Sequence, residues 1–141
     1  MLKTIRIALW IAVAVSLVVV GVLLWRADRQ EQAAAFRPAF SLPDETGAIH
    51  TTEEFKGKYV LVFFGFTNCP DICPTTMSEV AQVMDDLGPQ AEKVQPVFIS
   101  VDPARDRASG LDEYLAAFHP AILGLAGDEA STRAAVESFK V

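Results

Sequence analysis

Cysteine and histidine are scarce in this chain of 141 residues, which contains only two of each. A structural zinc site needs four ligands, and the sequence offers neither a second Cys-x-x-Cys motif nor a His pair to complete one. The two thiols, Cys69 and Cys73, can therefore pair only with each other, with a metal or with another molecule. Both lie in one short stretch, and the function should be sought there.

Positive charge is also in short supply. The chain has 12 Lys and Arg against 18 Asp and Glu, a formal net charge of −6, and residues 26–141 alone carry −8. A nucleic-acid-binding domain would show a basic patch or stripe, so this composition argues against that class of protein. The sequence also contains no internal repeat and no low-complexity tract.

A long apolar run occupies the N-terminal part of the chain. Residues 7–25 contain no charged side chain and are interrupted only by Ser16 and Gly21. A helix of that length can cross the roughly 30 Å hydrocarbon core of a bilayer. A cleaved signal peptide is the alternative, because Ala33–Ala35 offers small residues for cleavage. The run exceeds the usual apolar region of a signal peptide, and the alanines lie well beyond its end, so we predict an uncleaved anchor.

The anchor divides the chain and suggests its orientation. We predict a short cytoplasmic N-terminus (residues 1–6), a transmembrane anchor (7–25), a linker (26–38) and one domain (39–141). Lys3 and Arg6 precede the anchor, and basic residues favour the cytoplasmic side. The anchor starts too early to leave room for a mitochondrial transit peptide. We therefore predict a single-pass protein of a bacterial inner membrane with its domain in the periplasm, where a disulfide can persist.

The domain reads as an α/β fold with a largely parallel sheet, because predicted strands alternate with predicted helices. Tyr59–Phe66 is a continuous apolar run, typical of a strand covered on both faces. Thr76 and Glu79 fit a capping box for the helix that follows. The expected elements are a short strand and turn at 40–47, a strand at 59–66, a helix ending at Leu87, a strand at 94–101, a helix capped by Ser109 and stopped at His119-Pro120, a short strand at 122–125 and a helix from Asp128 to Ser138.

The two cysteines lie in the motif Gly65-Phe-Thr-Asn-Cys69-Pro-Asp-Ile-Cys73-Pro, between the predicted strand and helix. Positions i and i+4 of a helix share a face, so the two sulfurs can converge. Unpaired N–H groups at a helix N-terminus favour a thiolate, and we expect both thiols to ionise more readily than a free cysteine. Such a pair can exchange disulfides or hold a soft ion such as Cu(I). A purely structural disulfide is the third interpretation.

Asp102 is a further candidate because it directly follows the predicted strand at 94–101. In open α/β sheets, residues beyond the carboxyl ends of neighbouring strands meet at one crevice. Asp102 could therefore lie beside the sulfurs and accept a hydrogen bond there. The equal alternative is that residues 102–107 form a turn held by Asp–Arg pairs.

The other metal-binding side chains are poorer candidates. His50 falls in a predicted hairpin turn and His119 precedes a helix-breaking proline, so both are expected to be structural or solvated. Met77 and Met84 lie on the apolar stripe of the predicted helix, which favours positions in the core over a role as thioether ligands.

Two segments, Phe64–Met77 and Ser100–Asp106, together resemble the Sco/SenC family. The resemblance extends over about Phe40 to Val141, and its Cys-Pro-Asp-Ile-Cys-Pro signature is highly specific. Members of that family have a thioredoxin-like fold behind a single membrane anchor, bind copper and assist assembly of the binuclear copper centre of cytochrome c oxidase. The resemblance implies the same fold, one copper ion per chain and the copper-bearing oxidase subunit as partner.

The resemblance also assigns residues. The copper-binding cysteines of the family correspond to Cys69 and Cys73, and the aspartate of its Asp-Pro-x-Arg-Asp segment corresponds to Asp102. The third family ligand is a histidine in a C-terminal hairpin that lies beyond Val141, and His119 matches a different family position. We expect the sequence to be C-terminally incomplete, because the fold would otherwise leave an open sheet edge.

The leading hypothesis is a copper metallochaperone, not an enzyme, in which Cys69 and Cys73 hold Cu(I) as thiolates and pass it on by ligand exchange. The rival is a membrane-anchored thiol–disulfide oxidoreductase that uses the same two residues to reduce the cysteines of a partner. The Cys-x-x-x-Cys spacing departs from the Cys-x-x-Cys of thioredoxin-type redox sites, which disfavours the rival. A thiol peroxidase is a third and weaker alternative.

Overall fold

The computed structural model describes residue 10 and residues 14–23, 25–26 and 36–141. The chain divides into two units, Met1–Arg37 and Pro38–Val141. Residues 14–23 are helical and exposed. Among the described residues, no helix has both the length and the apolar character that crossing a bilayer requires. The predicted cytoplasmic N-terminus, residues 7–9, 11–13 and 24 of the predicted anchor, and residues 27–35 of the predicted linker lie outside the described residues.

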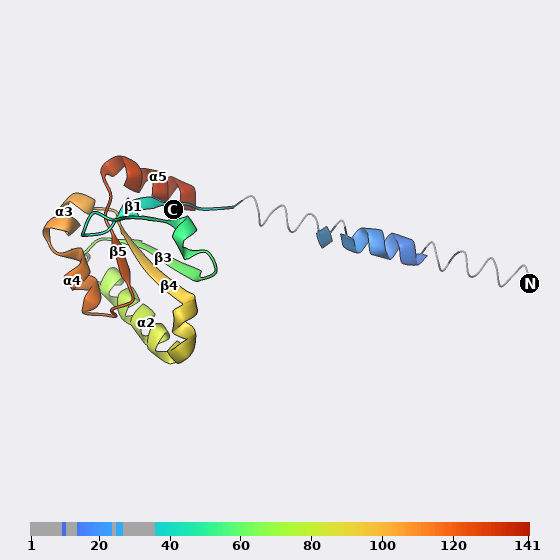
Figure 1. Ribbon diagram of the computed structural model, residues 1–141, viewed down its shortest axis with the longest axis horizontal. Helices are drawn as coiled ribbons and strands as arrows, with labels where there is room; N and C mark the ends of the chain where they lie inside the picture. Colours follow the sequence, from blue (N-terminus) through green and yellow to red (C-terminus); the bar gives the residue numbers. More distant parts are fainter. Residues whose placement is uncertain (1–9, 11–13, 24, 27–35) are drawn as a thin grey trace, which may run out of the picture. The chain divides into compact units, whose positions relative to one another are not determined.

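The second unit is built around a small sheet. The strands are β1 (Ser41–Pro43), β2 (Ile49–Thr51), β3 (Tyr59–Gly65), β4 (Val94–Ser100) and β5 (Leu123–Leu125). The helices are α2 (Ile72–Leu87), α3 (Pro103–Ala108), α4 (Leu111–Ala116) and α5 (Glu129–Phe139), with the 3-10 helices η1 (Thr52–Phe55) and η2 (Gly88–Lys93). Strands β3, β4 and β5 form a parallel sheet with β4 in the middle, and β1 and β2 form an antiparallel hairpin (Figure 1). The α/β prediction is therefore confirmed.

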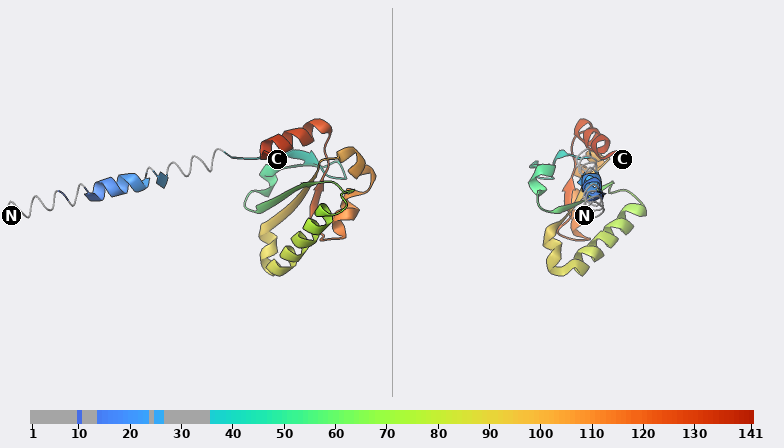
Figure 2. Two further views of the ribbon diagram at one scale, coloured as in Figure 1. Left: turned by 180° about the vertical axis from the view of Figure 1, so that it is seen from behind. Right: turned by 90° about the vertical axis from the view of Figure 1, so that its right-hand side faces the viewer.

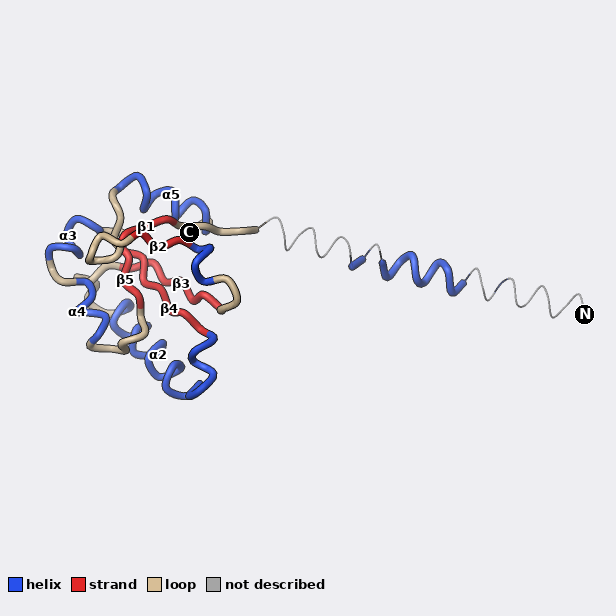
Figure 3. Tube along the Cα trace, viewed as in Figure 1, coloured by secondary structure: helices blue, strands red, loops and turns tan. Residues whose placement is uncertain are grey.

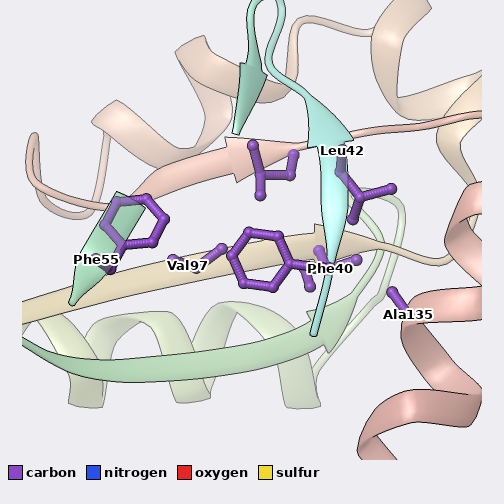
Figure 4. Close-up of a cluster of buried hydrophobic side chains, with 7 residues drawn as sticks. Phe40, Leu42, Phe55, Val97 and Ala135 are labelled. Atoms are coloured by element: carbon purple, nitrogen blue, oxygen red, sulfur yellow. The ribbon is translucent and has the colours of Figure 1, made fainter. Parts of the chain in front are cut away.

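Alternation along β4 divides the core between the two sides of the sheet, because successive strand residues point to opposite faces. Val97 and Ile99 face the hairpin and α5, where they pack with Phe40 and Leu42 (Figure 4). Phe98 faces the other side and packs with residues of α2 and α4. Helices consequently cover both sides of the strands, as Figures 2 and 3 show.

The strand that is covered on both faces is β4, and the prediction that assigned this role to Tyr59–Phe66 is wrong for the first half of β3. Tyr59 is 78% exposed and Leu61 is 44% exposed, whereas the last five residues of β4 are all buried. Within the described residues β3 pairs only with β4, so it lies at an edge of the sheet. The apolar run at residues 59–66 therefore predicted a strand correctly but did not predict that this strand lies at an edge of the sheet.

The N-terminus of α2 also differs from the prediction. The helix begins at Ile72, after Asp71, so Thr76 is not its N-cap and the predicted capping box is wrong. The Thr76 hydroxyl instead donates to the carbonyl of Ile72 at 2.8 Å, inside the helix. Gly88 follows the last residue of α2 with a positive φ of 50°, as expected for the residue that ends a helix.

Two further local predictions need correction and one is confirmed. Residues 103–108 form α3, and α4 begins after Gly110, so Ser109 does not cap it. The Ser109 hydroxyl donates to the carbonyl of Arg105 at 2.9 Å instead. His50 lies in β2 and not in a turn. Asp128 does cap α5, and its carboxylate accepts the backbone N–H of Ser131 at 2.7 Å.

Candidate metal centre

The cysteine loop, defined as residues 66–71, leaves the sheet at the carboxyl end of β3. Gly65 is the last residue of β3, and a Cβ atom there would lie 2.6 Å from the Phe63 ring and 3.0 Å from the Phe98 ring. Glycine therefore lets the chain leave the sheet close to two aromatic side chains. The loop then turns, with the Cys69 N–H donating to the carbonyl of Phe66 at 3.3 Å.

The structure brings the two predicted site cysteines together. Cys69 lies at the end of the loop and Cys73 in the first turn of α2. The Cys69 sulfur accepts a hydrogen bond from the backbone N–H of Cys73 at 3.4 Å, and the two thiols also hydrogen-bond to each other. Both are free thiols; Cys73 is buried, with 3% exposure, whereas Cys69 is half-buried. The i, i+4 spacing predicted this convergence.

The two thiols differ in acidity. Hydrogen bonds from the Cys73 side chain and from the backbone N–H groups of Cys73, Asp71 and Ile72 lower the pKa of Cys69. Burial is the main cause that raises the pKa of Cys73, and the neighbouring Cys69 raises it further. The prediction of easy ionisation is therefore borne out for Cys69 and wrong for Cys73, because burial outweighs the helix N-terminus there.

Asp106 is the site residue that the sequence analysis missed. Its carboxylate is fully buried and accepts three hydrogen bonds, from the Thr67 N–H at 3.1 Å, the Thr67 hydroxyl at 2.7 Å and the Ser100 hydroxyl at 2.6 Å. These bonds join the cysteine loop to the end of β4, and the charge of Asp106 also helps to raise the pKa of Cys73. The sequence analysis considered residues 102–107 as a turn, whereas Asp106 lies inside α3 and is buried there.

Asp102 forms the ion pair with an arginine that the alternative interpretation expected, although the residues after it form the helix α3 and not a turn. It precedes α3, its carboxylate pairs with the Arg105 guanidinium at 3.2 Å, and that carboxylate side chain is 37% exposed. Its backbone N–H donates to the Ser100 hydroxyl at 3.2 Å. Within residues 36–141 no hydrogen bond joins Asp102 to either cysteine. The carboxylate that supports the loop is thus one helical turn further along.

Neither histidine joins the cysteine pair. His50 lies between the carboxylates of Asp44, at 3.3 Å, and Glu54, at 3.0 Å. Burial lowers the pKa of His50, but these two carboxylates together raise it above its ordinary value. His119 accepts the backbone N–H of Ala121 at 3.1 Å through Nδ1. Both have the structural roles that the sequence analysis expected, and Met77 and Met84 are buried in the core, also as expected.

The arrangement suits two kinds of chemistry. Two sulfurs in contact, one accessible and one buried, can bind a soft monovalent ion such as Cu(I) or can form a disulfide. In the part of the chain that the structure describes, no three His, Cys, Asp or Glu side chains gather into a metal site. The donor set among these residues therefore fits Cu(I) held by two thiolates and does not fit a four-ligand zinc site.

Comparison with known proteins gives one family. The family model described as SCO1/SenC matches residues 28–141. An SCO2-like protein of Rickettsia felis is 42% identical over 102 residues, which cover 72% of this chain and 50% of that protein. The chain thus spans about half the length of the curated relatives that it matches.

Solved structures share the fold. Bradyrhizobium japonicum ScoI with copper bound is 42% identical, with a TM-score of 0.68 over 72% of this chain and 65% of that one. BsSco, described as having a disulfide switch and as a member of the Sco family of cytochrome c oxidase assembly proteins, is 27% identical, with a TM-score of 0.60 over 73% of this chain and 63% of that one. The thioredoxin-like α/β fold of Sco proteins, predicted from the resemblance, is confirmed by these similarities.

Proposed function

Because the chain belongs to the SCO1/SenC family, we propose that it is a copper chaperone that serves the assembly of the binuclear copper centre of cytochrome c oxidase. The observation that carries the proposal is the contact between Cys69 and Cys73, which forms a two-thiolate site for one Cu(I) ion. The copper-bound structure of a protein 42% identical to this chain supports the choice of metal. Its partner is the copper-bearing subunit of the oxidase.

The different environments of the two thiols give the binding a natural order. Cys69 is the more accessible and the more acidic thiol, so its thiolate meets the incoming ion first. Cys73 loses its proton when its sulfur joins the ion, and the two thiolates then hold one positive charge between them. A thiolate or imidazole of the acceptor can then take the ion by ligand exchange, replacing one sulfur at a time. Each cysteine sulfur regains a proton once it has left the ion, and burial favours the protonated form of Cys73 in the copper-free protein.

The test is Cu(I) binding by the full chain, measured by competition with a chromophoric chelator under reducing conditions. C69S and C73S should each abolish tight binding, because each removes one of two soft ligands. S78A is a matched control on the exposed face of the same helix and should bind copper as the wild type does. Tight, stoichiometric copper in the C69S/C73S double variant would contradict the proposal.

A second function, thiol–disulfide exchange with a partner, is favoured by the same difference between the thiols. An accessible thiol of lowered pKa beside a buried one is the arrangement of an attacking and a resolving cysteine. In that reaction the Cys69 thiolate attacks the partner's disulfide and forms a mixed disulfide with one partner sulfur, while the other partner sulfur leaves as a thiolate. The Cys73 thiolate then attacks the Cys69 sulfur, which forms the Cys69–Cys73 disulfide and releases the second partner sulfur as a thiolate. The C73S variant would accumulate a mixed disulfide through Cys69, and its absence with an oxidised oxidase subunit would count against this function.

We also propose that residues 7–25 anchor the protein in a bacterial inner membrane, with the domain in the periplasm. The support is the charge-free apolar run and the two basic residues before it. The anchored protein should resist extraction by alkaline carbonate, and added protease should digest the domain in spheroplasts while sparing it in intact cells. Extraction of the full chain by carbonate alone would contradict the anchor.

A further inference from the structure

Tyr114 carries a polar atom that nothing among the described residues satisfies. The side chain is half-buried, but its hydroxyl oxygen is inaccessible to solvent and has no hydrogen-bond partner within the described part of the chain. Buried hydroxyl groups are normally paired, because one that gives up water without gaining a partner is costly. An unpaired buried hydroxyl group therefore suggests that its hydrogen-bond partner forms in another state of the protein, for example after a ligand binds.

Tyr114 lies near residues that flank the two cysteines in the chain. Its ring stands edge-on to Phe118, with 5.2 Å between ring centroids, and packs on the cluster that contains Met77. Met77 lies on α2 one turn after Cys73. On the other side Tyr114 lines a shallow groove with Thr67 and Asn68, which directly precede Cys69. The tyrosine thus lies close to the helix that carries one cysteine and to the loop that carries the other.

The electrostatic surroundings agree with this placement. Burial is the main cause that raises the pKa of Tyr114, and the negative charges of Cys73, Cys69 and Asp106 raise it further, in that order. The phenol therefore stays protonated and keeps a hydrogen to donate. Asp106 already accepts bonds from Thr67 and Ser100, whereas the Cys73 side chain is buried away from water.

We propose that Tyr114 is a positioning residue of the copper site, whose hydroxyl donates a hydrogen bond to the Cys73 sulfur when that sulfur becomes a negatively charged copper ligand. The inference rests on the proposed copper-binding function. It gives the unpaired hydroxyl a partner in the loaded protein and gives the buried thiolate a donor that offsets its loss of water. Tyr114 contacts the ligand and does not itself bind the ion.

The first test compares Y114F with Y59F in the full chain, since each removes one phenolic oxygen. Tyr59 is 78% exposed and lies on β3, so Y59F is the matched control. Cu(I) affinity should fall about tenfold or more in Y114F, as for the loss of a hydrogen bond to a charged group, and should be unchanged in Y59F. The copper-free Y114F protein should be no less stable to urea than the wild type, because no hydrogen bond is lost.

The second test observes the hydrogen bond itself. The chain has only two tyrosines, so in the Y59F variant the tyrosine doublet of the ultraviolet resonance Raman spectrum reports Tyr114 alone. Adding one equivalent of Cu(I) should shift the doublet intensity ratio toward that of a strong hydrogen-bond donor. A ratio unaffected by copper, or a Y114F variant that binds Cu(I) as tightly as the wild type, would overturn this inference and leave the proposed function intact. Absence of cysteine-dependent Cu(I) binding in the wild type would overturn both.

Discussion

The β1–β2 hairpin and the carboxyl edge of the sheet both gather titratable side chains, and they use them differently. In the hairpin, Asp44 accepts hydrogen bonds from Thr46, Ala48 and His50, and the other ring nitrogen of His50 faces Glu54. Every one of these polar groups has a partner. At the carboxyl edge, Cys69 and Cys73 are free thiols, and the Cys69 sulfur accepts a hydrogen bond from the Cys73 N–H.

The comparison suggests how a structural polar cluster differs from a functional one. These polar groups of the hairpin are all paired with one another, so they stabilise the turn and leave no ligand for an ion. At the carboxyl edge, the Asp106 carboxylate accepts three hydrogen bonds and supports the cysteine loop. The Cys69 and Cys73 thiols beside it can still be deprotonated and bind a soft ion. A rigid support beside exchangeable ligands is what a site that takes up and releases an ion requires. Four substitutions or reactions probe this contrast.

The largest effect should come from removing the support at the carboxyl edge. D106A leaves the Thr67 N–H, the Thr67 hydroxyl and the Ser100 hydroxyl without an acceptor in a buried place. We expect a loss of about 3 kcal/mol in the free energy of unfolding, measured with urea, together with weaker Cu(I) binding. D106N keeps the shape and should cost less. A D106A protein as stable as the wild type would mean that Asp106 does not support the loop.

Next in size is the difference in reactivity between the thiols. Iodoacetamide should modify Cys69 at least about ten times faster than Cys73 at neutral pH, because Cys69 is accessible and more acidic. Peptide mass spectrometry after short reaction times measures the two rates separately. In urea the two rates should become similar, and equal rates in the folded protein would contradict the asymmetry on which the order of copper binding depends.

The contribution of the hairpin to stability should depend on pH, and a substitution in the hairpin should not change Cu(I) affinity. Hydrogen bonds, chiefly from the Thr46 side chain, lower the pKa of Asp44 from 3.8 to about 2. Because the folded value lies below the unfolded one, the stabilisation is fully present above pH 3.8 and is lost as the pH falls toward about 2. D44N should therefore be less stable than the wild type at neutral pH, with the difference shrinking across that acid range, as urea unfolding will show. A constant difference would contradict the network, and Cu(I) affinity should stay unchanged.

The smallest effect should come from Asp102. D102N removes only a partly exposed ion pair with Arg105, so Cu(I) affinity should stay within about twofold of the wild-type value. D106N, four residues further along the chain and inside α3, is the matched comparison. A clear fall in affinity for D102N, measured by the same chelator competition, would support the interpretation that Asp102 acts beside the sulfurs.

The sequence was most informative where structure is local. The spacing of Cys69 and Cys73 predicted their contact, because four residues make about one helical turn and the two cysteines lie on either side of the start of α2. Asp128 was recognised as a cap for the same reason. The loop between β3 and α2 could likewise be placed from the change in hydrophobic pattern.

Non-local features were predicted less well. Which strand is central depends on pairing between distant segments, so the apolar runs of β3 and β4 looked alike although only β4 is fully covered. The sequence does not distinguish Asp102 from Asp106, because the burial of Asp106 depends on hydrogen bonds to Thr67 and Ser100 in other parts of the chain. The unpaired hydroxyl of Tyr114 depends on the packing of α4 against α2 and left no signal in the pattern.

The central claim is that Cys69 and Cys73 together hold one copper ion. The most direct measurement is native mass spectrometry of the full chain after anaerobic addition of one equivalent of Cu(I), for the wild type and for the C69S/C73S variant. We predict a single bound copper in the wild type, with the loss of two thiol protons from the mass, and none in the variant. Equal copper in both proteins would place the ion elsewhere and contradict the account.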